Sequence, residues 1–89
     1  MSAPATNLGR TQKLVLRLLA CHVRPPTVRD LAMDWPGLTE SAVRGAIGRL
    51  ESRRLVDVAG YDGEARTYTL TGRGALVERA LNLDDEDER

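Results

Sequence analysis

The sequence predicts a small, mainly α-helical domain with one β-hairpin, in the order three helices, hairpin, final helix. Three observations predict this order. Apolar residues recur at helical spacing in three early stretches. Turn-forming pairs, Pro25-Pro26 and Pro36-Gly37, separate these stretches. Apolar and polar residues then alternate over 55–58 and 66–70, with a glycine-containing turn between the two runs.

The first helix is expected over about residues 11–22, after a flexible arm at residues 1–9. Four apolar residues at helical spacing predict its buried stripe, namely Leu14, Val15, Leu18 and Leu19. The two prolines that follow end the helix because neither can donate a backbone hydrogen bond. Cys21 is expected to pack in the core and His22 to lie at the helix end. The chain has no second cysteine or histidine that would complete a metal site with them.

A helix-turn-helix is predicted next, because two short helices are joined by a tight turn. Thr27 is expected to cap a helix from Val28 to about Asp34, with Trp35 plugging the core at its end. Its predicted inward residues are Val28, Leu31 and Ala32. The third helix should cover about 39–54, with Thr39 as its cap and Leu38 docking just before it. Its predicted buried face is Val43, Ala46, Ile47 and Leu50.

The hairpin is expected over 55–70, with its turn at residues 60–64. Thr71 should cap a final helix over roughly 72–82. Its predicted inward residues are Ala75, Leu76, Ala80 and Leu81. The acidic residues 84–89 contain no apolar side chain and are expected to form a disordered tail after a folded domain at 10–83.

The formal net charge of zero hides an uneven distribution. Residues 84–89 hold five acids and one base, so the remaining 83 residues carry twelve bases and eight acids, a net charge of +4. A mildly basic body permits nucleic-acid binding without proving it. The N-terminal residues have neither the charged nor the apolar region of a secretory signal, and a single cysteine excludes an internal disulfide. We therefore expect a cytoplasmic protein.

Three stretches resemble one known fold. Residues 27–32 are similar to the start of a second helix, residues 38–55 to a recognition helix, and residues 68–74, Tyr-Thr-Leu-Thr-Gly-Arg-Gly, to the passage from a wing into a last helix. In this order they resemble the winged helix-turn-helix domain of MarR- and PadR-type bacterial transcriptional regulators. The resemblance implies a three-helix core, a hairpin wing and a C-terminal helix. It also implies that wing arginines enter the minor groove or contact phosphates.

The sequence departs from those families in two respects. Arg54 stands where they often have glycine, and a left-handed backbone there is less favourable for arginine. From these 89 residues we expect neither the long helices that form the usual MarR-type dimer nor a ligand-sensing domain. The resemblance therefore implies neither dimerisation nor a small-molecule effector.

The candidate DNA-contacting residues lie mainly on the third helix. Arg44 and Arg49 can donate hydrogen bonds to guanine edges or phosphates. Gly45 and Gly48 would let the helix backbone approach the duplex closely. The full candidate set is Thr27, Arg29, Thr39, Ser41, Arg44, Gly45, Gly48, Arg49 and Arg66. The alternative is an ordinary solvated face, with Thr27 only a structural cap and Asp62 and Glu64 repelling phosphate from the hairpin.

The sequence thus favours sequence-specific binding of double-stranded DNA by a small prokaryotic or phage transcriptional regulator. Specificity would require a homodimer, through the first and last helices. A winged-helix protein-interaction module without DNA binding remains the alternative. No catalytic constellation, metal-ligand spacing or cofactor motif is present, so we expect neither an enzyme nor a metalloprotein.

Overall fold

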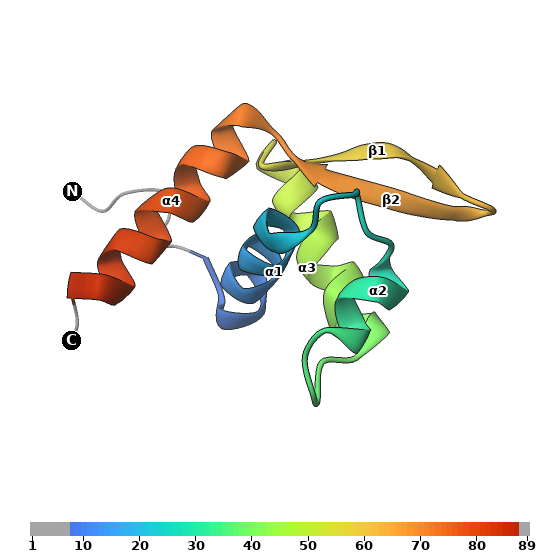
Figure 1. Ribbon diagram of the computed structural model, residues 1–89, viewed down its shortest axis with the longest axis horizontal. Coiled ribbons are helices and arrows are strands. Elements are labelled where there is room, and N and C mark those ends of the chain that lie inside the picture. Colours follow the sequence, from blue (N-terminus) through green and yellow to red (C-terminus); the bar gives the residue numbers. More distant parts are fainter. Residues whose placement is uncertain (1–7, 88–89) are drawn as a thin grey trace.

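The computed structural model describes the backbone of residues 8–87 and the side chains of residues 8–82. Its elements are, in order, α1 (Arg10–Cys21), α2 (Val28–Met33), α3 (Glu40–Ser52), β1 (Val56–Asp62), β2 (Ala65–Leu70) and α4 (Gly72–Asp87). The hairpin projects from one side of the helical body, and α4 lies on the other side (Figure 1). The predicted fold class, mainly α with a small β-hairpin, is confirmed. Within the described residues, no helix is both long and apolar enough to cross a membrane.

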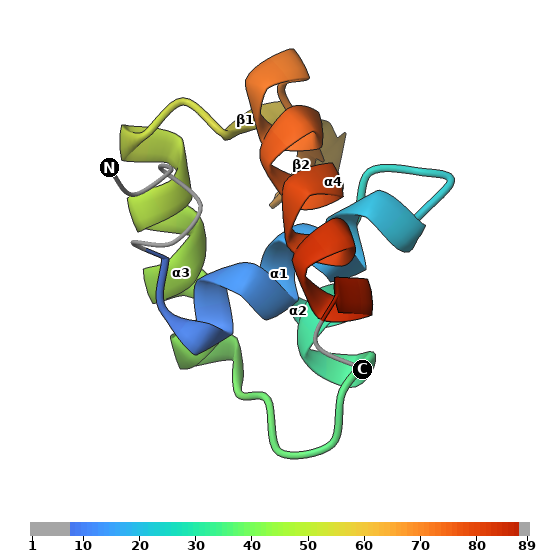
Figure 2. The same cartoon turned by 90° about the vertical axis from the view of Figure 1, so that its left-hand side faces the viewer.

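The core is built around α1, which packs against both α3 and α4 (Figure 2). Val15 and Leu16 are completely buried and Leu19 is nearly so. The predicted stripe was therefore only partly right, because Leu14 and Leu18 are half-buried and Leu16 was not predicted. Because α3 and α4 pack against α1, the buried face of α1 is centred on Val15, Leu16 and Leu19, and Leu14 lies at its edge.

The predicted flexible arm was wrong at its last two residues. Leu8 is buried in the core cluster, and Gly9 forms the N-cap position of α1, where its carbonyl accepts a hydrogen bond from Lys13 N. Burial of the apolar Leu8 side chain stabilises the folded protein by more than the conformational entropy that is lost when this short segment becomes ordered. Residues 1–7, which make up the rest of the predicted arm, lie outside the described residues.

The two helices of the helix-turn-helix begin where the sequence predicted. Thr27 caps α2 in a capping box, in which its hydroxyl accepts from Asp30 N and its own N–H donates to the Asp30 carboxylate. The Thr39 hydroxyl accepts from Ala42 N at the start of α3. The predicted buried face of α3 is confirmed in full: Val43, Ala46, Ile47 and Leu50.

Two residues predicted to be buried are not. Trp35 is 52% exposed, and Cys21 is also exposed. Cys21 is the last residue of α1 and lies at the surface, whereas Trp35 follows α2 and lines an open groove beside Arg10, Lys13, Leu14 and Arg17 of α1. His22, at the C-cap of α1, instead contacts the Asp34 carboxylate at the C-cap of α2 and so joins the two helix ends.

The hairpin spans nearly the predicted range, but its strands are longer than predicted and its turn is shorter. Asp62 pairs with Ala65, so the turn is only Gly63-Glu64, and the predicted turn residues 60–62 belong to β1. Val58 pairs with Tyr68 and Gly60 pairs with Thr67, so β1 has one extra residue between these two pairs. This β-bulge allows the strand pairing to continue to Asp62. The base of the hairpin is tied to the start of α2, because Tyr68 N donates to Pro26 O.

A tight corner joins α3 to α4. Arg54 adopts the left-handed conformation that the sequence analysis considered for it, with φ at 63°. Its carbonyl accepts a hydrogen bond from the Thr71 hydroxyl, and the same hydroxyl caps α4 by accepting from Gly74 N. A Cβ atom at residue 74 would overlap the Leu55 carbonyl oxygen, so only glycine fits there.

The final helix differs from its prediction in two ways. Leu76 is 66% exposed rather than inward, whereas Leu81 is buried as predicted. The helix also continues to Asp87, so residues 84–87 are not the disordered tail that was predicted. After Gly74 the chain has no glycine or proline to stop the helix. Residues 88–89 lie outside the described residues.

Candidate nucleic-acid interface

The outward face of α3 is open and has few side chains. Ser41, Arg44, Gly45, Gly48 and Arg49 are all exposed, as predicted from the helical period. A Cβ atom at either glycine would have no atom within 4 Å, so neither glycine is required by the packing of this chain. Among the described side chains, no large exposed apolar residue lies on α3. This face is therefore small, polar and flanked by guanidinium groups.

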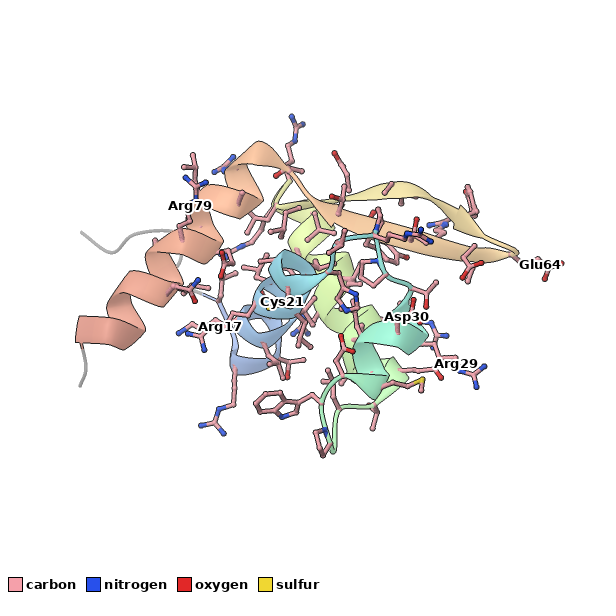
Figure 3. All side chains as sticks on the ribbon, in the orientation of Figure 1. Arg17, Cys21, Arg29, Asp30, Glu64 and Arg79 are labelled. Carbon is pink, nitrogen blue, oxygen red and sulfur yellow. The ribbon has the colours of Figure 1, made fainter. Side chains whose placement is uncertain are left out.

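A groove of about 500 Å³ runs between α2, the N-terminal half of α3 and β2. We call it the wing groove; its lining is Thr27, Val28, Arg29, Glu40, Arg44, Ala65, Arg66 and Tyr68. Three candidate arginines, far apart in the sequence, meet there: one from α2, one from α3 and one from β2. In Figure 3, Arg29 projects outward from α2 on the side of the molecule where the hairpin extends.

The basic character of the wing groove is reduced by one carboxylate. Arg44 Nη2 lies 3.5 Å from Glu40 Oε1, and the two side chains are 67% and 48% exposed. Exposed pairs of this kind are worth little and exchange easily. Arg44 is therefore available to a stronger anionic partner.

A second groove, of about 340 Å³, separates α3 from the start of α1. Ser41, Gly45 and Arg49 line it from α3, and Arg10 and Gln12 line it from α1. Arg10 is not among the residues predicted to contact DNA. The only feature of the sequence that marked Arg10 was its position just before the predicted first helix. Its proximity to α3 depends on how α1 and α3 pack together.

The two predicted cap residues have structural roles. The Thr27 hydroxyl is engaged in the capping box and the residue is only 7% exposed, whereas Thr39 is exposed at the start of α3. The hydrogen bond from Thr27 N lowers the pKa of Asp30 below its usual 3.8, helped by the nearby charges of His22 and Arg29. The two threonines therefore stabilise the starts of α2 and α3, the helices that carry Arg29 and Arg44.

The hairpin presents both signs of charge. Arg66 pairs in register with Tyr61, whose side chain is 67% exposed. Glu64 stands at the tip, as Figure 3 shows, and Asp62 is exposed beside it. Arg66 lies nearer the body of the domain than this acidic tip, and so it can reach an anion beside α3 without the tip doing so.

Comparison with known proteins identifies the fold. No protein-family model and no curated protein matches the sequence. A solved MarR family transcription regulator, SP03579, matches with a TM-score of 0.83 at 15% identity, over 92% of this chain and 54% of that chain. The adhesin competence repressor AdcR from Streptococcus pyogenes matches with a TM-score of 0.77 at 21% identity, over 93% and 61%. MepR from S. aureus matches with a TM-score of 0.78 at 25% identity, over 93% and 63%.

This chain has a MarR-type winged helix-turn-helix fold. In that winged helix, α3 occupies the place of the recognition helix, and the β1–β2 hairpin is the wing. The chain spans between about half and three fifths of the length of the structures it matches. Within the described residues, no group of three histidine, cysteine, aspartate or glutamate side chains could hold a metal ion.

Proposed function

We propose that this protein binds double-stranded DNA sequence-specifically, as a small prokaryotic or phage transcriptional regulator acting in the cytoplasm. The α3 helix enters the major groove and the hairpin lies against the flanking backbone or minor groove. One observation carries the proposal: Arg29, Arg44 and Arg66, from three separate elements, line one groove beside the open face of α3. Three guanidinium groups beside a helix that fits the major groove supply hydrogen-bond donors for the phosphates that border it.

The composition of the open face sets the mode of recognition. Gly45 and Gly48 allow close approach of the α3 backbone but contribute no base contact. Arg44 and Arg49 are the side chains long enough to reach base edges or phosphates. We therefore expect arginine contacts to dominate the affinity and DNA shape to contribute to the choice of site.

The charge distribution supports an anionic partner. The +4 carried by residues 1–83 provides the electrostatic attraction, and phosphate neutralisation makes the affinity fall with salt. The alternative function, protein docking through α3, lacks an apolar surface on that helix. The large exposed apolar residues lie elsewhere: Val23, Met33, Trp35, Val58, Tyr61 and Leu76.

Specific binding further calls for a homodimer, because a single module buries little surface on DNA. The surfaces we assign to it are α1 and α4. Leu76 on α4 supports this assignment, since it is apolar and 66% exposed in the single chain. Two copies related by a two-fold axis would place two α3 helices on successive major grooves of a palindromic site.

The proposal is tested by fluorescence-anisotropy titration of the full chain against random duplex DNA at low salt. Selection of bound sequences from a random pool follows. Binding should appear by micromolar concentrations, and Arg44→Ala should weaken a selected site by about 1–3 kcal/mol. The matched control is Arg24→Ala, an exposed arginine between α1 and α2 that lines neither groove. Absence of any DNA binding at these concentrations would refute the proposal, and a non-palindromic selected site would refute the two-fold dimer.

A further inference from the structure

Three arginines surround a hollow at the opposite end of α3 from the wing groove. This corner site, of about 300 Å³, is lined by Ser52, Arg53, Arg54, Leu55 and Arg73. Two of its arginines directly follow α3, and the third lies in the first turn of α4. No carboxylate lines it, in contrast to the wing groove with its Glu40. Among the described side chains, none forms an ion pair with these three arginines.

Hydrogen bonds hold the backbone of the corner in place. The Thr71 hydroxyl donates to the Arg54 carbonyl at 2.7 Å, and Thr71 N donates to the Leu55 carbonyl at 3.0 Å. Gly74 lies so close to Leu55 that no side chain fits between α4 and the corner. These contacts fix the backbone positions from which the three arginine side chains extend.

Arg54 occupies a backbone conformation that favours glycine. Its φ of 63° lies in the left-handed region, and its exposed side chain forms no ion pair with any side chain that the structure describes. This conformation closes the C-terminus of α3, where Leu55 N donates to Leu50 O and Arg54 N donates to Glu51 O. The neighbouring Arg53 and Arg73 give the same surface a concentrated positive charge.

The corner site continues the open face of α3. Ser41, Gly45, Gly48 and Ser52 follow one another along that face, and Ser52 also lines the corner. From Ser41 to Ser52 the helix rises about 16 Å, at ~1.5 Å per residue. The major groove is about 12 Å wide. A helix lying across that groove therefore brings its two ends to the two phosphate backbones that border it.

We propose that Arg53, Arg54 and Arg73 form a second phosphate-contacting surface, which holds one backbone of the major groove while the wing groove holds the other. This inference rests on the proposed DNA binding and adds a footprint that neither the recognition helix nor the wing supplies. Duplex DNA is the partner because the corner is continuous with the face that enters the groove.

The sharpest test is Arg54→Gly, because the proposal requires two opposite effects. Glycine relieves the left-handed strain, so the midpoint of urea unfolding should rise. DNA affinity should nevertheless fall several-fold, and the slope of log K against log salt concentration should lose about one unit. Arg73→Ala should lose a similar amount of slope. Combining the two changes should remove about two units, since each removes one phosphate contact.

The control is Arg24→Ala, which removes the same charge from a different part of the surface. Arg24 belongs to the segment between α1 and α2, which lies on the opposite side of Figure 2 from α3. Its substitution therefore measures only how the lower net charge of the protein affects DNA affinity. A change in slope for Arg54→Gly and Arg73→Ala that exceeds the change for Arg24→Ala supports the corner site. Equal slopes for all three variants overturn it.

The two proposals fail in distinguishable ways. If Arg44→Ala weakens binding while Arg54→Gly and Arg73→Ala do not, DNA binding stands and the corner site is wrong. If the wild-type chain does not bind duplex DNA, both are wrong. Hydroxyl-radical footprinting adds a positional readout, because the double variant should lose protection on only one of the two strands that border the groove.

Discussion

Glu40 and Arg44 form an ion pair one helical turn apart on the exposed face of α3, with 3.5 Å between Oε1 and Nη2. The pair places a carboxylate inside a groove that otherwise gathers three arginines. Glu40 lies in the first turn of α3, where a negative charge also stabilises the helix. The same residue therefore favours folding and opposes the approach of phosphate.

Replacement of Glu40 by glutamine should separate these effects. Glu40→Gln removes a charge that repels the DNA backbone, so we expect several-fold tighter binding at low salt. The free energy of unfolding should fall by about 0.5–1.5 kcal/mol, because the substitution removes both the ion pair and the favourable charge at the N-terminus of α3. Anisotropy titration and urea unfolding measure the two quantities. Glu51→Gln is the control, since Glu51 lies on the same helix but lines neither groove; equal effects of the two substitutions would count against the wing groove as the DNA-facing surface.

The two glycines of α3 provide a second test of the interface. Each is a poor helix former, and a Cβ atom at either would enter open space. Gly45→Ala and Gly48→Ala should therefore each raise the free energy of unfolding by up to about 1 kcal/mol. Both should also weaken DNA binding, because a methyl group would stand between the helix backbone and the duplex. Tighter or unchanged binding by the stabilised variants would contradict close approach of the backbone.

The helix-turn-helix could be predicted from the sequence because its signals are local. Thr27 and Thr39 cap the helices, and the buried positions of α3 follow one helical period. The errors arose where residue type suggested burial but the tertiary fold supplied no partner. Trp35 and Cys21 are examples, because Cys21 ends α1, Trp35 follows α2, and both side chains are exposed to solvent.

The hairpin shows a different limit. Residues 60–64 all have the composition of a turn, and only the pairing of Asp62 with Ala65 places the turn at Gly63-Glu64. Strand register depends on the partner strand, and the shift at Val58 and Gly60 that absorbs the extra residue has no sequence signature.

The candidate site was predicted residue by residue but not as a surface. The exposure of Arg44 and Arg49 follows from the period of α3. Their neighbours come from other elements: Arg29 and Arg66 at the wing groove, and Arg10 at the groove beside α1. Their proximity depends on how the elements pack together, which the local patterns of a sequence do not reveal.

The corner between α3 and α4 makes a prediction about stability alone. Gly74→Ala would drive a methyl group into the Leu55 carbonyl, so we expect the free energy of unfolding to fall by about 2–4 kcal/mol. Gly72→Ala is the matched control, because a Cβ atom there meets nothing within 4 Å. It should leave stability unchanged or raise it by up to about 1 kcal/mol. Urea unfolding of both variants measures the difference, and similar values for the two would show that the α3–α4 corner is not closely packed.

The Asp30 carboxylate gives the fold a predictable dependence on pH. Its hydrogen bond from Thr27 N lowers its pKa in the folded protein below the ordinary 3.8. A lowered folded pKa means that the folded state favours the charged form. The resulting stabilisation is present above about pH 3.8 and disappears as the pH falls through the lowered pKa.

The variant Asp30→Asn isolates this contribution, because an amide keeps the shape of the side chain but has no charge to titrate. Wild type should be more stable than the variant at about pH 6, and the difference should shrink as the pH falls below 3.8 and through the lowered pKa of Asp30. Urea unfolding across this pH range measures it. The contact between His22 and Asp34 is present in both proteins, whereas the attraction between His22 and the charge of Asp30 is present only in the wild type. A difference that stays constant with pH would show that the capping box acts through shape alone and that the charge on Asp30 does not stabilise α2.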